Sequence, residues 1–333
     1  MARQVIDVHV HFGAPGDPAS DCYWSRTFES GPTYFAVRLI TKSLFRKISI
    51  ESASRNLIDV VNGSRHVGKI VVLAMDGVYD ARGAACPERT HLYVRNSIIA
   101  DLARNSPRIL FGASVHPLRR DWEDELDSCL EKGAVLCKWI PSSQQIEPQS
   151  PACAPFFRKL AQSRLPLLCH VGTEGAIPPF DRRAQNLNRP SLLRNALDAG
   201  VTVIAAHAAL PLLPWPLQSR VFLRELVELF RESERRGWSL YTDLSAVNLG
   251  PRPALIDRIK SEIPGDRFVL GSDYPIPILS ISQRSGVRIR QRIKAYAETA
   301  GVRNPLDKNY LLIKNLGFED GLFTRASDIL RLS

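Results

Sequence analysis

The stretch Ile6-Asp7-Val8-His9-Val10-His11-Phe12 places two histidines, separated by one valine, in an apolar segment near the N-terminus. Side chains of an extended strand repeat every second residue, so His9 and His11 are expected to leave the backbone on the same face. Two neutral imidazoles at this spacing can chelate one divalent ion. The pair is equally compatible with two histidines that make ordinary hydrogen bonds, so the rest of the chain has to decide.

Seven further apolar segments read as strands, and they alternate with segments of helical pattern. Eight short, continuously apolar strands separated by helices are typical of parallel strands covered by helices, and eight strands close a (β/α)8 TIM barrel. An open doubly wound sheet is the alternative, but its Gly-x-Gly-x-x-Gly turn is missing. Strands are predicted at about 4–12, 69–76, 109–116, 134–140, 166–170, 201–207, 239–243 and 267–273. Helices are predicted at about 51–62, 88–105, 121–132, 154–163, 190–199, 218–236, 253–262, 284–300 and 306–315.

The segment 13–66 after the first strand is too long and too apolar for a plain connection. We predict a lid insertion of short helices that folds over one end of the barrel. Its aromatic side chains suggest an aromatic or apolar portion of a substrate and its arginines an anionic group, although simple packing and solvation explain them equally well. The residues concerned are Trp24, Arg26, Phe28, Tyr34, Phe35 and Arg38. Because there is no linker and no internal repeat, residues 1–333 are predicted to form one domain.

The composition is that of an ordinary globular protein, with 44% hydrophobic and 23% charged residues in 333. No secretory pattern and no apolar run near the roughly 18 residues of a membrane helix is present, so a cytoplasmic location is expected. The six cysteines include no C-x-x-C pair and are predicted to be reduced thiols.

The net charge of +10 raises the possibility of acidic partners or nucleic acid. The basic residues are dispersed among glutamates along presumed helix faces, which is typical of solvated helices and does not favour nucleic-acid binding. The expected partner is therefore a small molecule with an anionic or aromatic portion, without a membrane. Whether the chain also forms a homodimer stays open.

Polar residues stand at the carboxyl ends of the predicted strands, where TIM barrels carry their catalytic groups. Four of the seven histidines and one aspartate fall at the ends of the first, fifth, sixth and eighth strands. The first and eighth strands are neighbours in a closed barrel, so Asp273 is expected beside His9 and His11. Each histidine alone could be structural, but together they favour a metal site. The strand-end residues are His9, His11, His116, Lys138, His170, His207, Asp243 and Asp273.

This arrangement resembles the amidohydrolase superfamily of metal-dependent hydrolases, and in particular the amidohydrolase-2 family. The resemblance extends over nearly the whole chain. The stretches that carry it are D-V-H-V-H-F at 7–12, C-K-W-I-P at 137–141, L-C-H-V-G at 168–172, A-A-H-A-A at 205–209 and G-S-D-Y-P at 271–275.

The resemblance implies that His9 and His11 ligate a first metal ion and that His170 binds this ion or a second one. It implies that His207 is a second-metal ligand or a charge over the substrate, and that Asp273 is both ligand and proton shuttle. The ion is expected to be zinc, with manganese or iron as alternatives. The implied activity is hydrolysis, in which a metal-activated water attacks an amide, ester or lactone carbon.

Lys138 separates two forms of this chemistry. In the binuclear branch of the superfamily, a lysine at the end of the fourth strand carries a carbamate that bridges two ions. A bare ammonium beside two ions would be repelled, so we predict a carbamate on Lys138 and two ions. If Lys138 stays a plain lysine, the resemblance implies one ion and a mononuclear decarboxylase or hydratase of an aromatic or unsaturated carboxylate.

Two other functions compete with these. A TatD-like nuclease also begins with His-x-His, but such proteins have a glutamate in place of Lys138 and lack a long lid. An inactive scaffold barrel is the non-enzymatic alternative. The complete set of ligand types in this chain argues against it.

Overall fold

The computed structural model describes residues 3–13, 21–31, 34–35, 49–211, 218–276 and 289–332. Its centre is an eight-stranded parallel sheet, so all eight predicted strands are confirmed, most of them shorter than expected. In spatial order the strands are β1 (Ile6–His11), β3 (Lys69–Leu73), β5 (Ile109–Ala113), β6 (Ala134–Trp139), β7 (Leu167–Cys169), β8 (Val203–Ala205), β9 (Leu240–Asp243) and β10 (Phe268–Val269).

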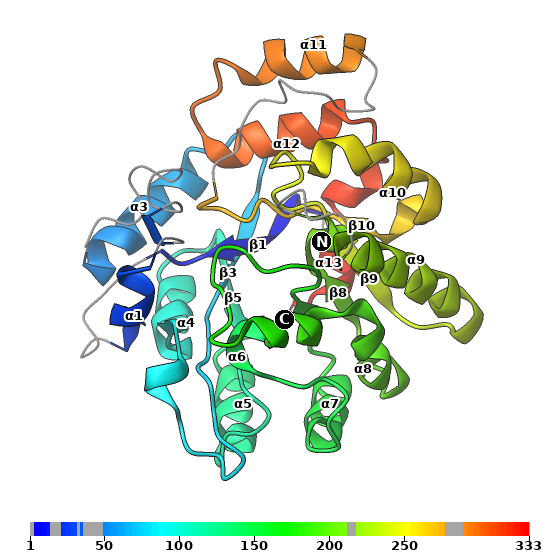
Figure 1. The fold of residues 1–333 in the computed structure, drawn as a ribbon. Coiled ribbons are helices and arrows are strands. Elements are labelled where there is room, and N and C mark those ends of the chain that lie inside the picture. Colours follow the sequence, from blue (N-terminus) through cyan, green and yellow to red (C-terminus); the bar gives the residue numbers. More distant parts are fainter. Residues whose placement is uncertain are drawn as a thin grey trace.

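The sheet closes into a barrel between its two outermost strands. The Val8 amide donates to the carbonyl of Leu270 at 2.9 Å, and the Asp273 amide donates to the carbonyl of His9 at 2.8 Å. Because β10 has only two residues, most of this closure lies beyond its end, where Val10 also pairs with Tyr274. The predicted TIM barrel is confirmed, and Figure 1 looks along it, with helices arranged around the strands.

Helices separate the strands at the predicted places. Ser49 caps α3 with its hydroxyl, and Asn304 caps α12 ahead of Pro305, both favourable ways to begin a helix. None of the helices in these described ranges combines the length and apolar character needed to cross a bilayer. The longer helices are α3 (Ile50–Asn62), α4 (Asn96–Arg104), α5 (Trp122–Glu131), α7 (Cys153–Gln162), α8 (Arg194–Asp198), α9 (Gln218–Arg236), α10 (Ile256–Glu262), α11 (Ile289–Thr299) and α12 (Pro305–Asn315).

The prediction of one helix over 88–105 is wrong in its first half. Residues before Asn96 form the 3-10 helix η2 (Pro87–Arg89) and the strand β4 (Leu92–Val94), which pairs antiparallel with β2 (Cys22–Trp24). Val94 also exchanges backbone hydrogen bonds with Met75. These non-local partners satisfy the backbone, so tertiary pairing overrides the local helical pattern.

The predicted helical lid over 13–66 is described only in part. The described portions contain the unpredicted strand β2, the short helix α1 (Arg26–Glu29) and α3. The remainder, including Arg38, lies outside the described residues, so the lid as a whole stays a prediction. The same holds for residues 284–288 of the predicted helix before α11.

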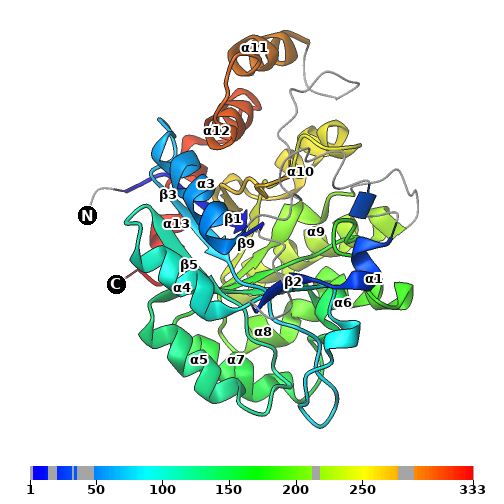
Figure 2. The same ribbon diagram turned by 90° about the vertical axis from the view of Figure 1, so that its left-hand side faces the viewer.

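The barrel interior is filled by apolar side chains from its strands. The short helix α13 (Ala326–Ile329) adds Ala326, and the residue after it, Leu330, joins the same cluster. Both ends of the chain lie on the side opposite to α1 and α6 (Pro141–Gln144) in Figure 2. Because this interior is apolar, the polar side chains of the strands gather at the mouth, at the carboxyl ends of the strands. The strand residues of this cluster are Ile6, Val8, Val71, Leu73, Val135, Leu136, Leu168, Ile204 and Val269.

A second apolar layer joins the strands to the surrounding helices. In this layer Trp139 of β6 stacks on Phe156 of α7, with ring centroids 5.2 Å apart. All six cysteines lie in the described part of the chain and none forms a disulfide, as predicted.

Candidate metal centre

The two histidines of β1 reach the barrel mouth through an irregularity in the strand. The register against β3 shifts between Asp7 and Val10. Ile6 and Val8 belong to the apolar interior, and the irregular stretch, which contains Val8 and His9, lets the two imidazoles meet at the mouth. His9 Nε2 lies 3.2 Å from His11 Nε2, so the side chains share one face, as the strand alternation predicts.

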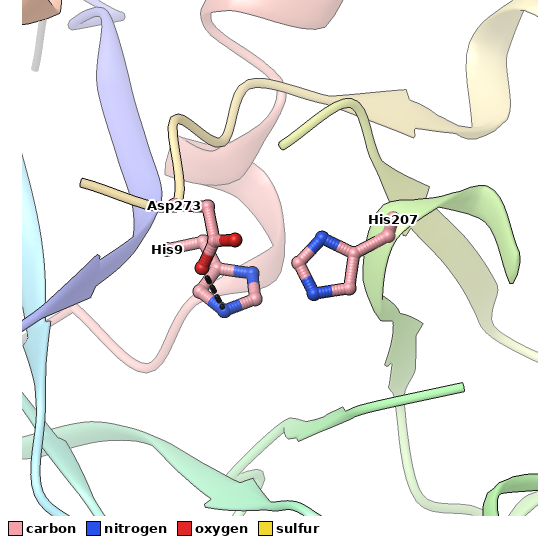
Figure 3. Close-up of side chains that lie close together, drawn as sticks. All are labelled: His9, His207 and Asp273. Atoms are coloured by element: carbon pink, nitrogen blue, oxygen red, sulfur yellow. Dashed lines mark ion pairs between the residues drawn. The ribbon is translucent and has the colours of Figure 1, made fainter. Parts of the chain in front are cut away.

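Asp273 approaches the same two imidazoles from the end of the eighth strand. Its Oδ1 lies 3.2 Å from His11 Nε2 and 3.5 Å from His9 Nε2. Figure 3 shows the contact with His9 as a dashed line. The residue has a φ of 63°, a left-handed conformation that is uncommon outside glycine, asparagine and aspartate. The hydrogen bond from its backbone amide to the His9 carbonyl holds this conformation, so barrel closure itself positions the carboxylate.

Lys138 enters the cluster from β6. The side chain is fully buried, and its Nζ lies 3.0 Å from His9 Nε2. Burial lowers the pKa of Lys138 below its usual value, although the carboxylates of Asp243 and Asp273 act in the opposite direction. The structure therefore shifts this amine towards its neutral form.

His207 and His170 complete the cluster from β8 and β7. The His207 ring lies 4.9 Å, centroid to centroid, from both the His9 and the His170 rings. His170 Nδ1 is 3.2 Å from Glu174 Oε2, while its Nε2 is buried and has no hydrogen-bond partner among the described residues. His116 lies elsewhere, with its two ring nitrogens bonded to the backbone of Leu118 and Gln144.

Asp243 and Ser245 hold the imidazoles in one tautomer. Asp243 Oδ2 accepts from His9 Nδ1 at 2.7 Å. Ser245 Oγ donates to Asp243 Oδ1 and accepts from His207 Nδ1 at 2.7 Å. Burial and the neighbouring Lys138 lower the pKa of His9, and burial lowers those of His170 and His207 well below their usual value. All three rings are thus neutral at neutral pH.

This donor set fits a divalent metal ion. With each Nδ1 bonded to a protein oxygen, the Nε2 atoms of His9, His170 and His207 keep unprotonated lone pairs. Without a cation, lone pairs and a carboxylate that face one another in a buried space repel each other. His9, His207 and Asp273 each offer one ligand atom, and these atoms lie within 4.8 Å of one another (Figure 3). Imidazole nitrogen and carboxylate oxygen are ordinary ligands of zinc, manganese and iron.

Comparison with protein families agrees with this geometry. A family model described as amidohydrolase, Amidohydro_2, matches residues 74–306, well over half of the chain. The chain belongs to this amidohydrolase family. The matched segment contains Lys138, His170, His207 and Asp273, whereas β1 with its two histidines precedes it. The resemblance recognised in the sequence is confirmed, and the family is one of metal-dependent enzymes.

Solved structures share the barrel fold. An uncharacterized TIM-barrel protein from Bordetella bronchiseptica has a TM-score of 0.55 at 14% identity, covering 94% of this chain and 99% of that one. A probable 2-pyrone-4,6-dicarboxylic acid hydrolase from Acinetobacter baumannii, with citric acid bound, has a TM-score of 0.52 at 14% identity, covering 95% and 100%. A 5-carboxyvanillate decarboxylase from Novosphingobium aromaticivorans, complexed with manganese and 4-hydroxy-3-methoxy-5-nitrobenzoic acid, scores 0.53 at 13% identity, covering 92% and 93%.

At these identities the likeness shows a common fold and leaves the reaction open. No match was found among curated protein sequences.

A pocket opens above the cluster of this amidohydrolase. Its polar lining includes His11, His170, His207, Asp273 and the buried Arg252. Arg26, a sequence candidate for an anionic group, lines a different pocket beside β2 and β4. The apolar lining residues are Phe12, Trp24, Leu92, Ile140, Ile177 and Leu249.

Sequence reasoning did not assign roles to several of these residues. Asp243 was visible as a polar strand end, but its role depends on contacts with His9 of β1, the backbone of His207 after β8 and that of Ser245 in its own following loop. Ser245 and Glu174 lie in loops and Arg252 begins a 3-10 helix, where no periodicity marks them. Sequence reasoning also missed Gly271, where a side chain would crowd the site. A Cβ there would lie 3.1 Å from the Cβ atoms of both His9 and Ser245.

Replacing Asp243 by asparagine should weaken metal binding. The amide has only one acceptor oxygen, so it cannot serve the His9 ring, the His207 amide and the Ser245 amide together. We expect metal affinity to fall about 10- to 100-fold, measured by titration with zinc and a chelating indicator. Asp198→Asn, on the exposed surface, is the matched control. An unchanged metal affinity in Asp243→Asn would show that Asp243 does not orient the imidazoles.

Proposed function

We propose that this chain is a hydrolase that acts on an amide, ester or lactone carbon of a small molecule. His9, His11, His207 and Asp273 would hold a divalent ion, with His170 on this ion or on a second one. The observation that supports the proposal is that ligand atoms of His9 and His207 lie within 4.8 Å of one another and of the ionised Asp273 carboxylate, while a protein oxygen fixes Nδ1 of each ring. When bound, the ion supplies the charge that lowers the pKa of water to about 7.

Asp273 would take up the proton that the water loses and deliver it to the leaving group. Burial by itself would raise the pKa of Asp273, but the hydrogen bond from His11 and the proximity of the His207 and His9 imidazoles outweigh it, and the net direction is downward. The residue is therefore ionised at neutral pH. Its contact with His11 aims Oδ1 at the cluster.

Lys138 would determine the number of ions. As a plain amine, its Nζ donates to His9 Nε2 and uses the lone pair that would otherwise bind an ion. Addition of carbon dioxide to the neutral amine forms an N–C bond and releases one proton, and the resulting carbamate carries a negative charge and two acceptor oxygens. A carbamate on Lys138, together with the unpartnered Nε2 of His170, would supply ligands for a second ion.

A mononuclear decarboxylase or hydratase is the second candidate. One observation favours it: within the ranges that the structure describes, His9, His207 and Asp273 make up a single compact ligand group. Turnover of aromatic carboxylates with release of carbon dioxide, against turnover of lactones, esters and amides, separates the two candidates.

The proposed metal centre is tested by elemental analysis of purified protein. We expect at least one divalent ion per chain, and its loss when His9 and His11 are both changed to alanine, because two ligands disappear together. His66→Ala, an exposed histidine stacked on Tyr310, should retain the ion. A metal-free wild-type protein with full activity would end the proposal.

Asp273→Asn should abolish most turnover while the shape of the side chain is kept. Loss of a positioned proton acceptor lowers rates about 10²- to 10⁴-fold. The kcat must be compared with that of the wild type at equal metal occupancy, so that a lost base is distinguished from a lost ligand. Equal rates at equal occupancy would exclude the proton-transfer role.

Lys138→Ala should lose the second ion, and a short carboxylic acid in solution should restore part of it. The measurement is the metal content per chain, with Lys159→Ala as a surface control. Crystals grown with bicarbonate provide the direct test. Density for an unmodified lysine beside one fully occupied ion would contradict the carbamate and leave His207 as a residue that faces the substrate.

A further inference from the structure

Arg252 is a buried cation that forms no ion pair with any residue in the described part of the chain. It begins the 3-10 helix η6 (Arg252–Leu255) and is 4% exposed, yet it lines the pocket above the ligand cluster. Its Nη1 donates to the carbonyls of Ser245 and Ala246 at 3.3 and 3.2 Å. Its Nε is buried and has no hydrogen-bond partner in the described part of the chain.

The neighbouring carboxylates are already engaged. Glu174 accepts from the amides of Ala176 and Ile177 through one oxygen and contacts His170 through the other. Asp273 contacts His11. Each acts on Arg252 through its charge without forming an ion pair, so the guanidinium keeps donor capacity that the described residues do not use.

A buried, unpaired charge is unfavourable unless a partner compensates it. A guanidinium presents parallel N–H donors in a fixed fork, a shape that matches a carboxylate. The pocket is also lined by apolar side chains, among them Trp24, Leu92, Ile177 and Leu249. Together these features select a ligand with one carboxylate and a compact apolar or aromatic body.

We propose that Arg252 binds a substrate carboxylate, and that the substrates are small carboxylic acids which carry the hydrolysable amide, ester or lactone elsewhere in the molecule. Binding of the carboxylate does not depend on the proposed function; only hydrolysis of the amide, ester or lactone group rests on it. In this assignment the carboxylate bound to Arg252 and the hydrolysable carbon beside Asp273 belong to different groups of the substrate.

The test measures binding of benzoate, phenylacetate and cyclohexanecarboxylate to the metal-loaded protein by isothermal titration calorimetry. Each acid is compared with its neutral amide, which has the same body without the charge. We expect the wild type to bind at least one acid more tightly than its amide. Arg252→Gln should lose this preference, with affinity for the acid about 10- to 100-fold lower, and Arg252→Lys should keep part of it.

Two further variants separate this role from others. Arg120→Gln removes an exposed arginine that also donates to a backbone carbonyl, and it should bind the acids like the wild type. His9→Ala removes a ligand of the metal centre and should keep the Arg252-dependent preference for the acid. The overall fold of each variant is checked by its circular dichroism spectrum.

Three outcomes would overturn the assignment: no acid binds better than its amide, Arg252→Gln binds the acids as the wild type does, or the preference disappears in His9→Ala and persists in Arg252→Gln. The last outcome would place the carboxylate at the metal centre. A different outcome is a wild type that takes up no metal and still binds the acids in a way that depends on Arg252. That result would uphold the assignment of Arg252 and refute the proposed metal-dependent hydrolysis.

Discussion

The buried carboxylate of Asp243 is the group on which the arrangement of the site depends. One oxygen accepts from His9, and the other accepts from the amides of His207 and Ser245. Burial tends to raise the pKa of Asp243, but the proximity and hydrogen bond of the His9 imidazole outweigh burial, so the net direction is downward and the group stays ionised. A single side chain at the end of β9 therefore connects β1, β8 and its own following loop.

This carboxylate also stabilises an unfavourable backbone. His207, Ala208 and Ala209 all have φ values between 50° and 60°. A left-handed residue other than glycine costs of order 1–3 kcal/mol. The His207 amide bonds to Asp243 and the Ala208 amide to the hydroxyl of Thr242, which offsets part of this cost. The small alanines in A-A-H-A-A fit such a turn, and the turn directs the His207 ring towards His9.

The sequence was sufficient for the parts of the molecule that follow from periodicity. Apolar runs located all eight strands, and the rule that barrel chemistry lies at strand ends located the histidines, Lys138 and Asp273. The β2–β4 ribbon was missed because it depends on a partner far away in the chain. Arg252 was missed because nothing in the local sequence distinguishes a buried arginine at the start of a short 3-10 helix from a solvated one; only the contacts in three dimensions do.

The interior of the barrel is packed with apolar side chains, and α13 with Leu330 covers its far end. Among the described residues, the layers of Ile6, Val8, Leu168 and Val269 leave no polar path through the barrel. Substrate entry and product release therefore use the same opening, at the carboxyl ends of the strands. If the product keeps the carboxylate of its precursor, it competes for the same guanidinium, and turnover then slows as product accumulates.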